Sequence, residues 1–451
     1  MRKKAKYLLI TLLVVTGLTP AVSAQSYSVI VETTPNADIR SIAAALGGTV
    51  LDSMGGNVYL LSLSSIPTNY PTGVKYIEPD TVQLSPGGHG AVFSVSPATA
   101  ADFYRNQPAM QRINLQKASP RATGRSIVIA DINAMVDVRH PALVGHLTAG
   151  AEFLQGTCVS RSTLNQSAGG FLDQSAGGFL DQSAGGFLDQ SAGGFLDQSA
   201  GGFLDQSAGG FLDQSAGGFL DQYMTFLNES TAFFLDPVTA SSLDRMSPAH
   251  GHGTMVAGIL AVMAPDAMIM PLRAFDDKGC GTTYNIAKAV KYAVSHGAQV
   301  INMSFGISGQ TQTLKKSIQE AVNAGITVVA SAGNGNTAVP QYPAAYPGVL
   351  GVAATNLTDV KASFSNYGST IFVSAPGSNI VSAYPGGYYA ELSGTSFSAP
   401  MVAAEAALLR SLKTSGWKNS IAAGVDNINA LNPAYIGQLG TGRINLLKAL
   451  Q

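Results

Sequence analysis

Three short segments of this 451-residue chain place a reactive or positioning side chain at the boundary of an element. In the first, His252 stands between two glycines at the start of an apolar run that ends at Ile259. In the second, Ser396 lies at the start of a predicted helix that runs to about Leu412. The unpaired N–H groups and the dipole at such a start favour the negative charge of an oxyanion beside a serine nucleophile. A capping histidine and an N-cap serine are the structural alternatives for these two residues.

The third segment carries an asparagine, Asn334, that leaves a buried strand through the glycines of Ser-Ala-Gly-Asn-Gly-Asn. Asparagine in such a place is a common turn residue. Its side-chain amide is also suited to donate a hydrogen bond to developing negative charge. Taken singly, each of the three segments therefore keeps a structural explanation.

The elements that must position these side chains alternate between short apolar runs and helical patterns from Arg125 onward. The runs predicted as buried strands are Ile127–Ile132, Met268–Leu272, Val300–Met303, Thr327–Ala330, Val349–Ala353 and Phe372–Ser374. Helices are predicted between them, over Asn285–Ser295 and Leu314–Ala324. This alternation predicts an α/β fold in which a parallel sheet is covered by helices on both faces.

Taken together, the three segments resemble those of the subtilisin-like serine proteases, the subtilases, whose order of acidic residue, histidine and serine is reproduced here. The similarity continues in Val300–Gly306, Gln341–Pro347, Ala362–Gly368 and Val373–Gly377, and it covers Arg125 to about Leu412 apart from an insertion. The resemblance implies an α/β fold with a subtilisin-like parallel sheet and helices on both faces. It also implies that the small α+β domain before this region is propeptide-like.

By this resemblance, His252 is the general base, Ser396 the nucleophile and Asn334 the side-chain donor of the oxyanion hole. Substrates of the family bind as an extended strand between two edge segments, through main-chain hydrogen bonds that tolerate many sequences. The corresponding residues are Gly279, Cys280 and Gly281 on one edge and Ser304, Phe305 and Gly306 on the other. Cys280 would then lie on the substrate cleft, where a free thiol and a disulfide with Cys158 are both open.

The acidic motif departs from the family pattern. An ungapped alignment puts Asn133 at the position of the catalytic aspartate, and Asp131 lies two residues earlier on the same face of the predicted strand. Three arrangements are open: Asp131 reaches the imidazole through a shifted strand end or a water, Asn133 orients His252 without a charge, or catalysis has been lost. Asp137 is the remaining nearby acid, but the family also has Asp there, outside the triad, so we assign it a structural role.

The N-terminal part of the chain predicts export and processing. Residues 1–24 combine four basic residues, an apolar run and small residues before Ala24, which is typical of a secretory signal peptide. The apolar run is too short to span a bilayer, so no stable membrane anchor is expected after signal cleavage. Residues 25–84 are predicted to form the propeptide-like or inhibitor-like domain, 85–112 a linker, and 113–451 the subtilase-like catalytic domain. We therefore expect a secreted, extracellular or periplasmic protein.

An insertion over about residues 148–248 interrupts the family pattern. It carries seven copies of the octapeptide Gln-Ser-Ala-Gly-Gly-Phe-Leu-Asp at residues 166–221. Two glycines in each copy disfavour a helix, so a β-type coil and disorder are the alternatives. The insertion is either a tolerated low-complexity segment or a spacer or adhesive element.

Composition and missing motifs exclude several classes of function. The formal charge of −1 provides no global field for nucleic acid, and two cysteines are too few for a disulfide scaffold. Neither a Gly-x-Ser-x-Gly elbow around Ser396 nor a His-Glu-x-x-His zinc motif is present. No cofactor or metal site is predicted, although structural calcium is common in the family and its ligands do not map onto this sequence. The sequence thus predicts a serine endopeptidase acting on peptides or proteins; the alternative is a catalytically impaired relative that binds peptides or interacts through its repeats.

Overall fold

The structure is a computed structural model that describes residues 26–84, 89–93, 103–154, 249, 251–307, 309–412 and 415–451. The chain forms two units, divided between Pro79 and Asp80. The predicted signal peptide, Cys158 and the octapeptide repeats lie outside the described residues. Of the helices that the structure does describe, none combines the length and the hydropathy needed to cross a membrane.

The first unit consists of an antiparallel sheet and one helix. Its sheet has the strand order β2-β3-β1-β4, and the buried side chains of β1 and β3 meet those of the helix around Ala43. Its elements are β1 Tyr27–Thr33, α1 Ile39–Ala45, β2 Gly48–Gly55, β3 Val58–Leu63 and β4 Val74–Pro79. The α+β composition expected of this region is seen in the structure, while the propeptide role of the unit stays a prediction.

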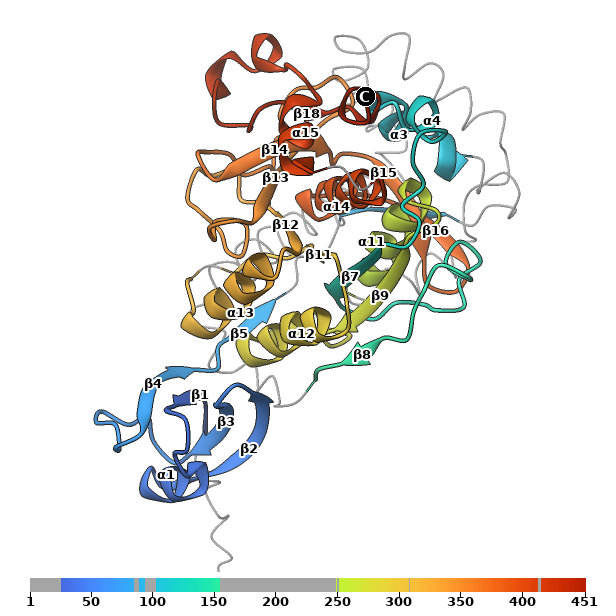
Figure 1. Ribbon diagram of the computed structural model, residues 1–451. Helices are drawn as coiled ribbons and strands as arrows, with labels where there is room; N and C mark the ends of the chain where they lie inside the picture. The colour runs from blue at the N-terminus through green and yellow to red at the C-terminus, as the bar shows by residue number, and fades with distance from the viewer. Residues whose placement is uncertain are drawn as a thin grey trace, which may run out of the picture. The chain divides into compact units, whose positions relative to one another are not determined.

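A nine-stranded sheet forms the centre of the second unit (Figure 1). Its strands follow the order β17-β18-β14-β13-β12-β11-β7-β9-β8, and the β17–β18 pair is antiparallel whereas the seven strands from β14 to β8 are paired in parallel. The bounds are β7 Val128–Asn133, β8 Ala151–Glu152, β9 Met268–Arg273, β11 Val300–Met303, β12 Thr327–Ser331, β13 Leu350–Thr355, β14 Ile371–Pro376, β17 Val425–Asp426 and β18 Arg443–Ile444. All six predicted strands are confirmed. These strands have continuous apolar sequences, which made them predictable, because both faces of this sheet are covered.

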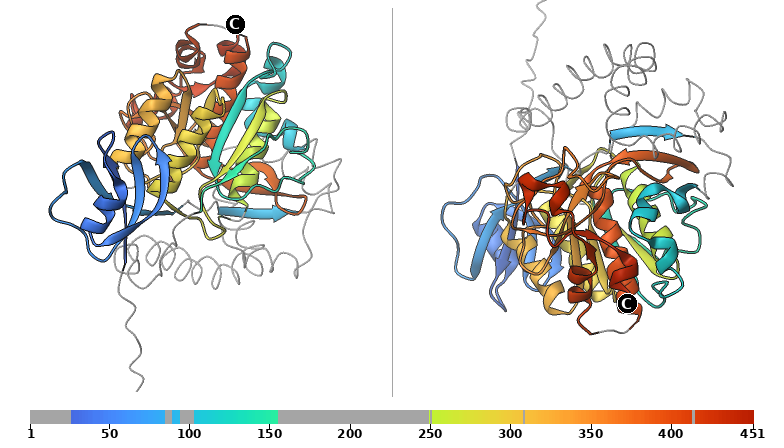
Figure 2. Two further views of the ribbon diagram at one scale, coloured as in Figure 1. Left: turned by 60° about the horizontal axis from the view of Figure 1, so that its bottom comes forward. Right: turned by 90° about the horizontal axis from the view of Figure 1, so that it is seen from above.

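Four long helices cover the sheet (Figures 1 and 2). On one face, α11 and α14 pack together over a single large core; α12 and α13 lie on the other face. Their bounds are α11 His252–Met263, α12 Thr283–Ser295, α13 Gln312–Asn323 and α14 Thr395–Ser411. The shorter helices are α3 Pro108–Arg112, α4 Leu115–Ala118, α15 Trp417–Ala423 and α16 Leu446–Ala449. The predicted α/β class with helices on both faces is confirmed.

Two small sheets use residues from the segment that follows the first unit. β5, Val82–Leu84, pairs antiparallel with β10, Cys280–Thr282. β6, His89–Phe93, pairs with β16, Tyr388–Ser393, which also pairs with β15, Ile380–Tyr384. The segment expected to be a linker, 85–112, is therefore partly structured. Ala109 and Met110 of α3 are buried in the main core, which is why this part of the segment is ordered.

Candidate active site

Three neighbouring parallel strands deliver polar side chains to one edge of the large sheet. Asn133 is the last residue of β7, Ser304 follows β11, and Asn334 follows β12. The order β12-β11-β7 places these strand ends side by side. The carboxyl edge of a parallel sheet is where α/β folds bind ligands. This edge therefore collects three of the residues that the sequence singled out.

His252 reaches this edge because the first turn of α11 packs against the end of β7. A Cβ atom on Gly253 would lie 2.5 Å from the carbonyl oxygen of Met135 and 2.6 Å from that of Ala134. Only a residue without a side chain permits this approach. The His-Gly pair of the sequence thus serves a close contact, with His252 contributing the side chain and Gly253 the space.

His252 contacts Asn133 and not Asp131. The Nδ1 atom of His252 lies 2.7 Å from Asn133 Oδ1, and both residues are buried. Asn133 Oδ1 also accepts a hydrogen bond of 2.9 Å from the backbone N–H of Ala134. Of the arrangements left open by the sequence, the structure has the one in which the asparagine itself meets the imidazole.

Asp131 lies behind Asn133 and is completely buried. Its carboxyl oxygens lie 3.4 and 3.5 Å from Asn133 Nδ2, and Oδ1 accepts a hydrogen bond of 2.9 Å from Asn302 Nδ2. Burial raises the pKa of Asp131 to about 7, against the opposing effect of these two amides. The carboxyl group of Asp131 is therefore close to the imidazole of His252 but does not contact it, because the Asn133 amide lies between them.

Ser396 lies at the start of α14, after the N-cap residue Gly394. Its Oγ donates to the carbonyl of Ser304 at 3.0 Å, and Ser304 Oγ donates to the carbonyl of Ser396 at 2.8 Å. The next residue, Phe397, has its ring centroid 5.8 Å from that of His252. These contacts fix the start of α14 against the end of β11 and beside the imidazole.

Burial governs the protonation of His252. The side chain is 1% exposed, and this desolvation lowers its pKa to about 4. The Nε2 atom has no hydrogen-bond partner among the described residues. At neutral pH the imidazole is therefore uncharged, and a neutral imidazole is the form that can accept a proton.

The Asn334 side chain is held in one orientation by Thr395. Asn334 Oδ1 accepts from the backbone N–H of Thr395 at 2.9 Å and from its Oγ1 at 2.8 Å. Thr395 Oγ1 in turn accepts from the N–H of Gly333 at 3.1 Å. With the oxygen occupied twice, Nδ2 is left as the donor of the amide. The sequence did not indicate this role of Thr395 in orienting the Asn334 side chain.

The loop that follows Asn334 is tied by an ammonium group. Lys361 Nζ donates to Asn336 Oδ1 at 2.8 Å and to the carbonyls of Ala362 and Ser365 at 2.9 and 3.0 Å. The rings of Tyr367 and Tyr435 lie 5.4 and 5.0 Å from the same atom, within cation–π range. One side chain thus joins two loops beside the site.

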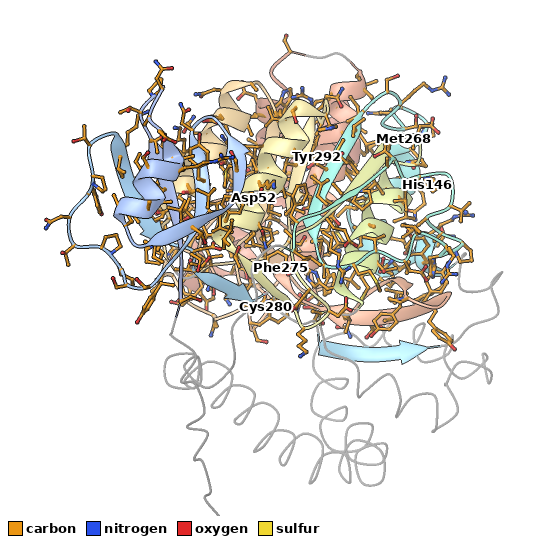
Figure 3. All side chains as sticks on the ribbon, turned by 90° about the horizontal axis from the view of Figure 1, so that it is seen from below. Asp52, His146, Met268, Phe275, Cys280 and Tyr292 are labelled. Atoms are coloured by element: carbon orange, nitrogen blue, oxygen red, sulfur yellow. The ribbon has the colours of Figure 1, made fainter. Side chains whose placement is uncertain are left out.

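The two segments expected to bind substrate lie at the same end of the sheet. Gly279 and Gly281 flank Cys280 on β10, and a Cβ atom on Gly281 would lie 2.6 Å from the carbonyl of Ala274. Phe305 packs on Phe275 with ring centroids 5.0 Å apart, and Gly306 follows it. Cys280, drawn near Phe275 in Figure 3, is disulfide-bonded, so the free-thiol alternative does not hold. The strand edge at Cys280, on β10, is already paired with β5.

Asn302 is the second residue that sequence reasoning missed. Its Nδ2 donates to Asp131 and, at 3.0 Å, to Ser304 Oγ, so it links the acid to the residue that contacts Ser396. A polar residue inside the buried strand Val-Ile-Asn-Met was the available signal. Within the described ranges, no group of three or more His, Cys, Asp or Glu side chains is placed to hold a metal ion.

Comparison with known proteins places the chain in a family. The model of the subtilase family matches residues 124–431. Thermitase of Thermoactinomyces vulgaris is 41% identical over 216 residues, which cover 45% of this chain and 75% of thermitase. The thermophilic serine proteinase of Bacillus sp. (strain AK1) is 45% identical over 172 residues, which cover 36% of this chain and 43% of that protein.

A solved structure supports the fold independently. Fervidolysin from Fervidobacterium pennivorans, described as a keratinolytic enzyme related to subtilisin, matches with a TM-score of 0.64 and 22% identity. The match covers 95% of this chain and 61% of fervidolysin. At this identity the likeness shows a shared fold.

Proposed function

The chain belongs to the subtilase family, and on that premise we propose that it is a secreted serine endopeptidase that hydrolyses peptide bonds of peptide or protein substrates. The observation that carries the proposal is that both sequence neighbours of Ser396 contact the other two residues. Thr395 donates to Asn334 Oδ1, and the ring centroid of Phe397 lies 5.8 Å from that of His252, whose imidazole is neutral. Nucleophile, base and oxyanion donor are the three functions that acyl transfer needs.

In the proposed reaction, Ser396 Oγ attacks the scissile carbonyl carbon and its proton passes to His252 Nε2. For this step, Oγ rotates away from the Ser304 carbonyl, with which it is hydrogen-bonded here. The oxyanion is stabilised by Asn334 Nδ2 and by the N–H of Ser396 at the start of α14. The imidazolium then returns the proton to the leaving amine, and water hydrolyses the acyl-enzyme by the same steps in reverse.

Asn133 fills the place of the acidic member in this proposal. Its Oδ1 accepts from Nδ1–H of His252, which leaves the lone pair on Nε2 for the serine proton. The amide lacks the negative charge that would stabilise the imidazolium. We therefore expect a slower enzyme than one with a carboxylate at this position.

The pairing of β5 with β10 supports binding of an extended peptide. Val82–Leu84 adds as an antiparallel strand to the edge at Cys280–Thr282. This is the main-chain mode of recognition by strand addition, which demands little of the side chains. We propose that substrates use this edge after the segment containing β5 has been released by cleavage.

Labelling with a fluorophosphonate probe tests the proposal. We expect the wild-type chain and Ser398→Ala to be labelled and Ser396→Ala to remain unlabelled. Ser398 is the matched control because it is a buried serine of the same helix turn whose hydroxyl donates to backbone carbonyls at 3.1 and 3.2 Å. Absence of labelling on every chain, with intact thermal unfolding, would favour the impaired, peptide-binding relative.

A further inference from the structure

An asparagine in the place of a catalytic carboxylate creates a problem of orientation. Both oxygens of a carboxylate accept, whereas an amide has one accepting and one donating end. If Nδ2 of Asn133 faced His252, then Nδ1 would have to accept and the proton of the imidazole would lie on Nε2. That tautomer cannot take the serine proton, and a wrong tautomer is the reason given for the loss of about 10⁴ in kcat when asparagine replaces the triad aspartate of a serine protease.

The neighbours of Asn133 distinguish its two ends. On one side, the N–H of Ala134 lies 2.9 Å from Oδ1 and can only donate. On the other, the carboxyl group of Asp131 lies 3.4 and 3.5 Å from Nδ2. A reversed amide would set its NH₂ against the N–H of Ala134 and its oxygen against the Asp131 carboxylate. Two attractive contacts would become two repulsive ones in a buried site, where electrostatic interactions are strong.

The side chain of Asp131 is itself held in place by a hydrogen bond from Asn302. Asn302 Nδ2 donates to its Oδ1 at 2.9 Å, and the same amide group donates to Ser304 Oγ. The carboxyl group is 0% exposed, and burying it away from water is costly. An apolar side chain at this point in β7 would fill the same space without that cost.

We propose that Asp131 is a positioning residue: it orients the Asn133 amide so that Oδ1 faces His252, and thereby fixes the proton of the imidazole on Nδ1. The inference rests on the proposed function, which it deepens. In this chain the acid of the site acts through an amide placed between it and the base.

The tautomer of His252 gives a test that does not depend on activity. We would label the full chain with ¹⁵N-histidine in the Ser396→Ala background, which prevents self-digestion, and assign His252 from the signal lost in His252→Gln. At pH 8 we expect a protonated Nδ1 and an unprotonated Nε2. Asp131→Leu should reverse or mix this pattern. Asp131→Asn should keep it because an accepting oxygen remains. Glu405→Leu is the control: it removes a buried carboxyl group on α14 and should leave the pattern unchanged. An unchanged His252 in Asp131→Leu overturns the proposal.

Kinetics on an unstructured peptide separate positioning from general support of the fold. We expect Asp131→Leu to lower kcat by about 100-fold or more with little change in KM. In the background of Asn133→Asp, whose carboxylate needs no orientation, the same substitution should cost less than about threefold. Equal losses in both backgrounds would show a structural role and overturn the proposal. If Asp131→Leu does not fold, Asp131→Ala replaces it in both experiments. If the wild type has no activity, the proposed function fails while the tautomer result still decides this inference.

Discussion

Gly253 of α11 and Ala134, the residue after β7, are in such close contact that a Cβ atom on the glycine would lie 2.6 Å from the carbonyl oxygen of Ala134. This contact sets how near the base can come to Asn133. The geometry of the site therefore depends on a position that carries no functional group.

Gly253→Ala should impair activity more than its helix propensity would suggest. Alanine favours a helix by up to 1 kcal/mol over glycine, but the overpacking here costs typically 1–3 kcal/mol and moves α11 away from β7. We expect kcat/KM to fall roughly tenfold or more as the His252–Asn133 contact lengthens. Gly309→Ala is the control, because nothing lies within 4 Å of a Cβ at that position. Equal kcat/KM for both variants would contradict the prediction.

Exchanging the two residues, Asp131→Asn with Asn133→Asp, should raise kcat/KM by roughly 10- to 100-fold. The exchange puts a carboxylate against His252 and retains an amide behind it. A gain below the full 10⁴ is expected because the tautomer is already correct in the wild type, which leaves only the charge effect on the imidazolium. Asn133→Asp alone should gain less, since two carboxyl groups at 3.4 Å share one proton. A decrease in the exchanged variant would contradict this account.

The pH dependence of kcat/KM should report Asp131. His252 has a pKa of about 4 and is neutral above it, whereas Asp131 ionises at about 7. Because an ionised Asp131 favours the imidazolium across the amide, we expect activity to rise with pH around 7. Asp131 is hydrogen-bonded to the side-chain amides of Asn133 and Asn302, and an amide does not titrate. In Asp131→Asn, the rise near pH 7 should disappear and activity should depend on the lower pKa of His252. A profile shared by both chains would assign the titration elsewhere.

Export of the active chain should release the first unit. We expect a mature N-terminus between about Ser85 and Arg105, beyond the strand β5 that pairs with β10. Ser396→Ala should keep the first unit attached because self-cleavage needs the nucleophile. N-terminal sequencing of both secreted forms makes the comparison. The same mature N-terminus in Ser396→Ala would show that another protease performs the cleavage.

Glu405 should lower the stability of the folded chain at neutral pH. It is fully buried in α14, neither carboxyl oxygen has a hydrogen-bond partner in the described structure, and burial raises its pKa well above 4.5. The folded state thus retains a proton that the unfolded state releases above pH 4.5, so the free energy of unfolding falls as pH rises through this window. Denaturant unfolding should show Glu405→Gln gaining about 1–3 kcal/mol over the wild type at pH 8 and little at pH 4. Glu320→Gln, on the surface, should show no such pH-dependent gain.

The sequence predicted the central strands of the large sheet well, but it did not predict the short elements that depend on contacts with distant parts of the chain. Val300–Met303 was predicted with the bounds that β11 has, because a strand buried on both faces is a continuous apolar run. By contrast, α3 and β6 were expected to be linker. A five-residue helix and an edge strand that begins with histidine and glycine depend on partners distant in sequence.

The acidic member of the site shows a different limit. Asp131 and Asn133 lie on the same face of β7, and their order in the sequence does not say which one the imidazole meets. The choice is made by the position of α11, and therefore by the space at Gly253. Asn302 was a visible anomaly in an apolar strand, but its partners follow from the register of β11 against β7, which pairs it with Asp131.

The ammonium of Lys361 has a consequence for how the surroundings of the site respond to solution conditions. Its hydrogen bonds to oxygens of Asn336, Ala362 and Ser365 hold together oxygen atoms of the kind that a bound metal ion coordinates in other loops. A positive charge that is covalently part of the chain cannot be extracted by a chelator or diluted away. The junction beside Asn334 is therefore held by a residue of the chain itself and needs no dissociable metal ion.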